Sequence, residues 1–331
     1  MMMKIALTGD VMLGRLVDQY VIQNRSVRPA ALWGDVLPIM LAADCRIINL
    51  ECVISSLGEE WHPTTKAFHF RARPRTIEFL AAGKINGVTL ANNHVLDYGP
   101  EALLNCFTLL DQAGIKRTGA GATMEEAGAP FVLDLPESRV AVVALTDNEP
   151  EWEATNTKPG VNYVAYGDGG LEKPYRSRMT QTLQSVRRQA DFVIVSAHVG
   201  PNWGTPSKEI QALARDFIDM GADLYWGHSN HTPQGIELYK EKAILYSTGD
   251  FIDDYWIDQD ERNDLSFLFM LEVEQGRLAR IRLHPTCIED LGVRRAHEQE
   301  WEFLARTMQT KCEPFGTVVS VEEQIGTINM K

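Results

Sequence analysis

The sequence is poor in cysteine and contains no paired cysteine motif. Its 331 residues include five cysteines, no two of which form a C-x-x-C pair: Cys45, Cys52, Cys106, Cys287 and Cys312. A disulfide framework and a cysteine-ligated structural zinc site both need closely spaced cysteines, so neither is expected. The pattern favours buried, reduced thiols.

Apolar segments long enough to cross a membrane are also missing. A transmembrane helix needs about 20 consecutive apolar residues, and no stretch of this sequence approaches that length. The opening segment, MMMKIALTGD, turns polar too early for a secretory signal peptide. We therefore expect a cytoplasmic protein without a membrane span.

Positive charge is scarce. The chain has 32 Lys and Arg against 45 Asp and Glu, which gives a net charge of -13 and a pI of about 5.1. Nucleic acids and anionic membranes bind basic surfaces, so neither is expected as a partner. An anionic substrate remains open, because a bound metal ion can reverse the local field. The oligomeric state remains open too.

Short apolar runs alternate with segments of helical spacing. Unbroken apolar runs predict strands buried on both faces at residues 4–8, 46–50, 87–91, 192–197 and 222–226. Helical spacing with proline, serine or glycine boundaries predicts helices at 74–82, 100–113, 175–189 and 207–220. This order predicts an α/β fold. Later runs at 235–239, 243–247, 266–274 and 277–283 predict a second, antiparallel or mixed sheet.

Polar side chains follow the carboxyl end of every one of the five predicted apolar strands. They are Asp10, Glu51, Asn93, His94, His198, His228 and His231. Each alone is explained as a turn residue or a structural hydrogen-bonding group. In open α/β sheets, however, sites form where such strand ends meet. Carboxylate, amide and imidazole donors together suit one or two divalent ions of Mn, Ca, Zn or Fe.

Two aspartates are placed to orient histidines. Asp97 follows His94 by three residues, close enough to orient the imidazole and raise its basicity. The alternative is a helix-capping aspartate. In the acidic segment GDFIDDY, Asp250 is expected to pair with a site histidine, the alternative being a solvated acidic loop. Such pairs beside a metal suit general acid/base catalysis, for which we expect His94, Asp97, His228 and Asp250.

Substrate contacts are expected from Arg15, Asn92 and Trp203. Arg15 could bind a carboxylate or phosphate through two parallel hydrogen bonds. Asn92 precedes the histidine of the NNH motif, and Trp203 stands in a segment rich in glycine and proline, where it could line a groove for a peptide.

Six segments resemble, in order, motifs of the CapA family, also called PgsA or the poly-γ-glutamate capsule biosynthesis family. They are GDVMLGR (9–15), NLE (49–51), ANNHVLDYG (91–99), HVGPNW (198–203), GHSNHTPQGIE (227–237) and LYSTGDFIDDY (245–255). The resemblance runs from about residue 4 to residue 285. It implies the four-layer αββα sandwich of the calcineurin-like metallophosphatases. We expect this domain at residues 1–290, with a C-terminal helix and tail at 291–331 packed on it.

The resemblance also implies site roles. The metal ligands would be Asp10, Glu51, Asn93, His198 and His231, and His94 would be the catalytic imidazole. Met12 stands where the phosphoesterases place a further histidine ligand, and His228 and His231 are three residues apart instead of two. One ion or two therefore remain open. We expect His231 to bind metal and His228 to handle a proton.

The expected function is metal-dependent acid/base chemistry on a peptide or poly-γ-glutamate-like substrate, by amide hydrolysis or transfer. Three alternatives stay open. Paired histidines and carboxylates beside a metal also suit epimerisation at a peptide Cα. The fold implied by the resemblance suits phosphoester hydrolysis, and the capsule pathway suits a non-catalytic component of a polymer-synthesis complex.

Overall fold

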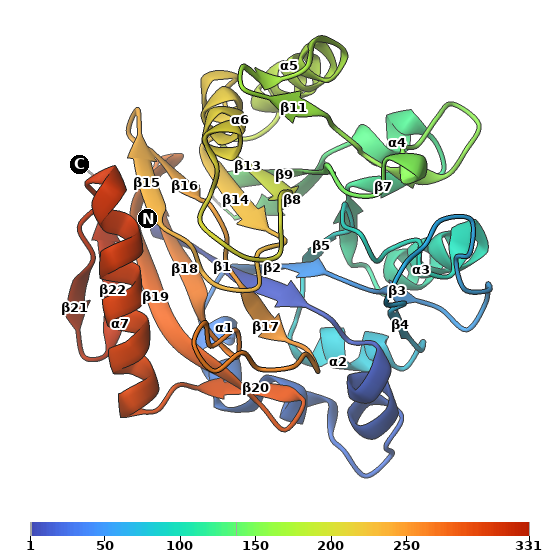
Figure 1. The fold of residues 1–331 in the computed structure, drawn as a ribbon, viewed down its shortest axis with the longest axis horizontal. Coiled ribbons are helices and arrows are strands. Elements are labelled where there is room, and N and C mark those ends of the chain that lie inside the picture. Colours follow the sequence, from blue (N-terminus) through green and yellow to red (C-terminus); the bar gives the residue numbers. More distant parts are fainter. Residues whose placement is uncertain (1, 137, 331) are drawn as a thin grey trace.

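Two stacked β-sheets form the centre of the molecule, and helices cover their outer faces (Figure 1). The computed structural model describes residues 2–136 and 138–330. The first sheet has the order β21 (Ser320–Glu322), β22 (Ile325–Asn329), β19 (Arg277–Glu289), β18 (Leu265–Glu274), β1 (Met2–Val11), β2 (Cys45–Leu50), β5 (Gly87–Thr89) and β6 (Lys116–Thr118). Beside it, β17 (Asp250–Ile252) pairs with β1, and β20 (Gly292–Arg295) pairs with β19.

The second sheet lies face to face with the first. Its order is β15 (Ile236–Tyr239), β16 (Lys242–Leu245), β14 (Leu224–His228), β13 (Phe192–His198), β9 (Ser138–Thr146) and β8 (Phe131–Leu135). Short ribbons join β3 (Val53–Ile54) to β4 (Arg71–Ala72), β7 (Ala120–Gly121) to β10 (Gly160–Val161), and β11 (Tyr166–Gly167) to β12 (Gly170–Leu171). The strands that matter for the site, β1, β2, β5 and β17 in one sheet and β13 and β14 in the other, run parallel within their sheets.

The helices form the two outer layers, except α7 (Glu298–Cys312), which packs against the core between the sheets. They are α1 (Leu37–Leu41), α2 (Thr76–Ala82), α3 (Gly99–Gln112), α4 (Met124–Gly128), α5 (Lys173–Arg187), α6 (Lys208–Asp219) and α7 (Glu298–Cys312), with short π and 3-10 turns at η1 (Val17–Ile22), η2 (Pro29–Val36), η3 (Pro150–Trp152) and η4 (Glu313–Phe315). Figure 1 shows α5 and α6 on one side of the sheets and α2 and α3 on another. Among the described residues, no helix combines the length and apolar character that a bilayer span requires.

Three apolar cores hold these layers together. One packs α2 and α3 against the outer face of the first sheet, and another packs α5 and α6 against the outer face of the second. The third fills the space between the sheets, where Trp301, Leu304 and Met308 of α7 extend it. Because strand side chains alternate in direction, a strand buried on both faces needs the unbroken apolar run that the sequence shows.

The predicted four-layer αββα arrangement is confirmed. The five apolar runs form β1, β2, β5, β13 and β14, and the four helical segments form α2, α3, α5 and α6. The prediction of a separate second sheet from the later runs is wrong. Instead, β15 and β16 join the sheet of β13 and β14, whereas β18 and β19 join the sheet of β1 and β2. The strands β8 and β9 were not predicted.

Candidate metal centre

Polar residues occupy the last inward positions of strands in both sheets. On β13, Phe192 and Ile194 point into the core between the sheets, and His198 is an even number of residues further on. On β14, Trp226 lies in the same core and is followed two residues later by His228. Because side chains two residues apart share a face of the sheet, both imidazoles face the opposite sheet. The apolar core therefore ends in a polar layer.

Strand register aligns these polar residues. Asp10 of β1 pairs with Asn49 of β2 on one side and with Asp250 of β17 on the other, and His198 pairs with His228 in the second sheet. The ladder between β1 and β2 shifts register just before Asp10, which returns its side chain to the inward face.

Gly9 makes room for this arrangement. A Cβ at this position would lie 2.1 Å from the carbonyl oxygen of Gly249, so only glycine lets β1 and β17 approach so closely. The approach lets the Asp10 amide donate to that same carbonyl (2.8 Å). It thereby sets the Asp10 carboxylate beside the start of β17.

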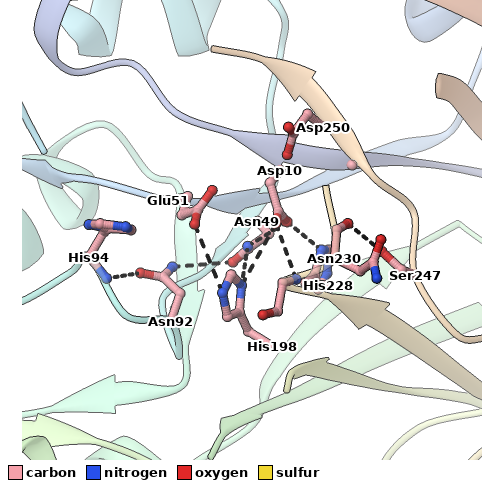
Figure 2. A network of polar contacts seen from close by, with 12 residues as sticks. Asp10, Asn49, Glu51, Asn92, His94, His198, His228, Asn230, Ser247 and Asp250 are labelled. Carbon is pink, nitrogen blue, oxygen red and sulfur yellow. Dashed lines mark hydrogen bonds and ion pairs between the residues drawn. The ribbon is translucent and has the colours of Figure 1, made fainter. Parts of the chain in front are cut away.

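Asp10, Glu51 and His198 form a buried three-residue cluster. Each offers one ligand atom, and these atoms all lie within 4.8 Å of one another. His198 Nδ1 lies 3.8 Å from Asp10 Oδ2, and its Nε2 lies 3.9 Å from Glu51 Oε1. Figure 2 shows both carboxylates directed toward the His198 ring, with the His228 ring on the far side of Asp10. The cluster thus joins groups from both sheets.

The protonation of this cluster suits a cation. Burial raises the pKa of Glu51 well above its usual range, and the charges of Asp10 and Asp250 raise it further. Burial lowers the pKa of His198 to about 3, which keeps its imidazole neutral. Burial also works to raise the pKa of Asp10, but the neighbouring His228, His198 and Asn49 lower it to about 2. A divalent ion would meet one carboxylate, one displaceable proton and a neutral nitrogen.

Several buried polar atoms around the cluster lack a hydrogen-bond partner within the described chain. They include Nε2 of His228 and Oδ1 of Asn93. An unsatisfied buried polar group costs about 1–3 kcal/mol, so a cluster of them calls for a ligand. In addition, His228 Nδ1 lies 2.6 Å from Asp10 Oδ1. Carboxylate oxygens, an amide oxygen and imidazole nitrogens fit a divalent metal ion.

Asn49 organises the cluster, although the sequence did not mark it as a site residue. Its Nδ2 donates to Asp10 Oδ1 (2.8 Å) and lies 3.2 Å from His198 Nδ1. Its Oδ1 accepts from Thr89 (3.1 Å) and Asn92 (3.3 Å). The side chain therefore ties the candidate ligands of the two sheets to the NNH segment. Its place two residues after Ile47, an inward residue of β2, was the signal that could have identified it.

The first histidine–aspartate pair joins His94 to Asp97. Nδ1 of His94 lies 2.6 Å from Oδ2 of Asp97, and the Phe70 amide donates to the same oxygen (2.6 Å). The Phe70 ring stacks on the imidazole with centroids 3.8 Å apart. Burial lowers the pKa of His94 well below its usual value, and the charge of Lys66 adds to this effect. His94 is therefore a neutral imidazole paired with Asp97, whose own pKa burial raises to about 7.

The second pair joins His231 to Asp250. Nδ1 of His231 lies 3.0 Å from Oδ1 of Asp250. Burial opposes protonation, but the Asp250 carboxylate overcomes it and raises the pKa of His231 to about 9. This imidazole is therefore protonated at neutral pH. Figure 2 shows His94 beyond Glu51 and Asp250 beyond Asp10.

Two of the three residues expected to contact substrate, Arg15 and Trp203, have partly exposed side chains. Arg15 has one nitrogen, Nε, 3.2 Å from Asp254, and its guanidinium carbon lies 5.5 Å from the centre of the Phe70 ring. Trp203 is 43% exposed, and its ring lies 5.5 Å from that of His231. Arg15 thus lies over a ring that stacks on His94, and Trp203 lies against His231.

Asn92 instead uses its side chain within the protein. Its Nδ2 donates to the Leu50 carbonyl (2.9 Å) and to Asn49, and its Oδ1 accepts from the His94 amide (3.0 Å). It is fully buried. These contacts hold the turn that presents His94.

Comparison with known proteins identifies the family and several relatives of this chain. Residues 4–255 match the family model described as Bacterial capsule synthesis protein PGA_cap. A Mycobacterium tuberculosis protein, "Probable polyglutamine synthesis accessory protein", is 30% identical and aligns over 94% of this chain and 92% of its own. "Capsule biosynthesis protein CapA" of Bacillus anthracis is 28% identical over 75% of this chain and 59% of its own length.

Solved structures share the fold. A structure described as a novel phosphatase from Mycoplasma pneumoniae superposes with a TM-score of 0.54 at 13% identity, covering 91% of this chain and 97% of that one. A hypothetical protein from Thermus thermophilus gives a TM-score of 0.50 at 17% identity, over 84% and 97% of the two chains. The mixed α/β sandwich is thus of the metallophosphatase type that the resemblance implied.

Proposed function

This chain belongs to the PGA_cap family of bacterial capsule synthesis proteins, and from that premise we propose that it is a metal-dependent enzyme that hydrolyses or transfers an amide bond of a peptide or poly-γ-glutamate-like chain. One observation carries the proposal: beside the buried carboxylate–histidine cluster, one histidine–aspartate pair holds a neutral imidazole, His94, and another holds a protonated imidazole, His231. Groups whose environments push their pKa values apart are the usual mark of a general base and a general acid.

Asp10, Glu51 and His198 would hold the metal, because their ligand atoms already converge. The free Nε2 of His228 and Oδ1 of Asn93 are the next candidates. When bound, a divalent ion supplies a Lewis acid that polarises a substrate carbonyl. This assignment exchanges the two histidines of the GHSNH turn relative to the expectation from sequence. His228 lies against Asp10 on the metal side, and His231 lies against Asp250 on the proton-transfer side.

The chain's own residues then divide the proton transfers. Asp97 holds Nδ1 of His94, which leaves Nε2 to take a proton from the attacking nucleophile. His231, kept charged by Asp250, gives a proton to the leaving nitrogen. Arg15, whose Nε faces Asp254 and whose guanidinium lies over the Phe70 ring beside His94, would hold a substrate carboxylate.

Epimerisation at a peptide Cα is the second candidate. Inversion at carbon needs a base and an acid, and the two histidine–aspartate pairs, His94–Asp97 and His231–Asp250, supply one of each. The same residues would act, with His94 removing the Cα proton and His231 returning one. No bond to nitrogen would break in this reaction.

One experiment separates these reactions. Protein loaded with Mn²⁺ or Zn²⁺ is incubated in D₂O with an oligo-γ-glutamate, with an α-linked peptide and with an aryl phosphate. New amine and a shortened chain support hydrolysis, and deuterium at Cα without cleavage supports epimerisation. Release of phosphate alone would replace both with a phosphoesterase. Asp10→Asn and His94→Gln should abolish turnover, whereas Lys242→Met, at a distant ion pair, should not. A metal-loaded protein inert toward all three substrates would contradict the proposal.

A further inference from the structure

Lys66 is a buried cation beside the candidate base. Its side chain is 6% exposed, and Nζ lies 3.2 Å from Oδ1 of Asp97. The same ammonium donates to the backbone carbonyl of Asn93 and to Oε1 of Glu149 (3.1 Å), and it lies 4.6 Å from the centre of the Trp152 ring. Nothing in the sequence pattern around HPTTKAFHF marks this lysine.

The surroundings of this ammonium are complete. An ammonium removed from water is costly unless charges and hydrogen bonds replace its hydration. Here two carboxylates, a carbonyl and the face of an indole ring do so. The partners come from two chain segments, the turn from Asn93 to Asp97 and the segment from Glu149 to Trp152, and Lys66 itself lies on a third. Lys66 is the point where these segments meet.

The two carboxyl oxygens of Asp97 face different partners. Oδ2 faces His94 and accepts from the Phe70 amide, while Oδ1 faces Lys66. The ion pair at Oδ1 and the contacts at Oδ2 together oppose rotation of this carboxyl group away from its histidine. The contact of Lys66 with the Asn93 carbonyl also fixes the backbone immediately before His94. The lysine thus acts on both members of the pair without touching the imidazole itself.

We infer that Lys66 is a positioning residue, which locks the Asp97 carboxylate and the Asn93–His94 backbone so that Nδ1 of His94 stays bound to Asp97. Its catalytic meaning rests on the proposed function, in which Nε2 of His94 takes a proton. The positioning itself does not depend on any substrate. It can therefore be tested on the metal-free protein.

A proton held between Nδ1 of His94 and Asp97 gives a far-downfield proton resonance, because the two atoms are only 2.6 Å apart. The test is proton NMR of ¹⁵N-histidine-labelled protein, with the resonance assigned by its absence in His94→Gln. Lys66→Met is expected to move the resonance upfield or lose it to solvent exchange. Lys66→Arg, which keeps a cation facing Asp97, is expected to restore it. Lys242→Met removes a comparable partner of a buried aspartate, Asp223, far from the site and should leave the resonance in place.

Folding is checked by thermal unfolding of each variant. Where Lys66→Met does not fold, Lys66→Gln, which keeps a polar donor without the charge, is measured in its place. The same upfield shift or loss of the His94 resonance is expected. A folded Lys66→Met or Lys66→Gln protein with an unchanged His94 resonance would overturn the inference.

Turnover supplies the second readout. With any active substrate, Lys66→Met should lower kcat by roughly 10- to 100-fold and leave KM unchanged, and a rise in KM alone would contradict the inference. A wild-type protein without turnover would remove the proposed function, whereas the resonance would still decide the role of Lys66.

Discussion

Nε2 of His198 lies 3.9 Å from Oε1 of Glu51, although the two residues belong to different sheets. His198 ends β13 of the second sheet, and Glu51 follows β2 of the first. Neither sheet carries the three-residue cluster alone. The apolar core between the sheets therefore sets the ligand geometry, and any ion bound there stabilises the packed state over the unfolded chain.

Asp10→Asn should weaken metal binding strongly while leaving the fold intact. The asparagine keeps the size of the side chain and one acceptor oxygen but loses the charge that faces His198 and His228. Loss of an outer partner alone costs metal sites about 10- to 100-fold, so loss of a ligand charge should cost roughly 100-fold or more in affinity. Isothermal titration with Mn²⁺ and Zn²⁺ measures it. Asp264→Asn, at a buried aspartate paired with Arg262, is the matched control. Equal affinities for Asp10→Asn and wild type would rule out the cluster as the metal site.

Glu51→Gln should stabilise the metal-free protein and remove its response to metal. Burial and the charges of Asp10 and Asp250 raise the pKa of Glu51 well above its usual range. The folded protein therefore loses stability as pH rises from the unfolded pKa of about 4.5 through the raised value. A glutamine cannot ionise, so we expect a gain of about 1 kcal/mol at neutral pH in urea denaturation without metal. Saturating metal should then stabilise the wild type but not the variant. A variant less stable than metal-free wild type would show that the Glu51 carboxyl supports the fold.

Gly9→Ala should damage both stability and the site. The added Cβ would lie 2.1 Å from the carbonyl oxygen of Gly249, so β1 and β17 must separate. Overpacking of this kind costs about 1–3 kcal/mol in unfolding free energy. Because Asp10 follows directly, metal affinity should fall as well. Gly167→Ala is the control, since a Cβ added there would have no atom within 4 Å. A Gly9→Ala protein as stable as the control would contradict the close approach of the strands.

Much of the candidate site follows from strand periodicity. A strand buried on both faces reads as an unbroken apolar run, and the residue that follows it lies at the edge of the sheet where sites form. This logic leads from the sequence to Asp10, Glu51 and His198, which the structure brings together. The same logic applied to the run VAVVALT would have identified β9, which was overlooked.

Other features depend on packing that no local pattern encodes. The later alternating runs are strands, but only the register between distant segments decides which sheet each one joins. Likewise, the three-residue spacing of His228 and His231 does not say which one meets Asp250. Ser229 adopts a left-handed backbone (φ 79°) between them, and this turn sends His228 toward Asp10 and His231 toward Asp250. Lys66 reaches Asp97 from a loop without regular structure, so its role is visible only in three dimensions.

His231 should give the metal-free protein a stability that declines in alkaline solution. The Asp250 carboxylate raises the pKa of this imidazole to about 9, against 6.5 for the free side chain. A raised folded pKa contributes stability that is fully present below pH 6.5 and is lost as pH rises through about 9. The difference in unfolding free energy between wild type and His231→Gln should therefore shrink across this window. His284→Gln is the control, because burial lowers the pKa of His284 to about 4 and its titration ends below the window. If this difference in unfolding free energy stays constant from pH 6.5 to about pH 9.5, the Asp250 carboxylate does not keep His231 protonated. His231 would then be unable to serve as the general acid, and the rate of a metal-loaded enzyme would lose its expected decline above about pH 9.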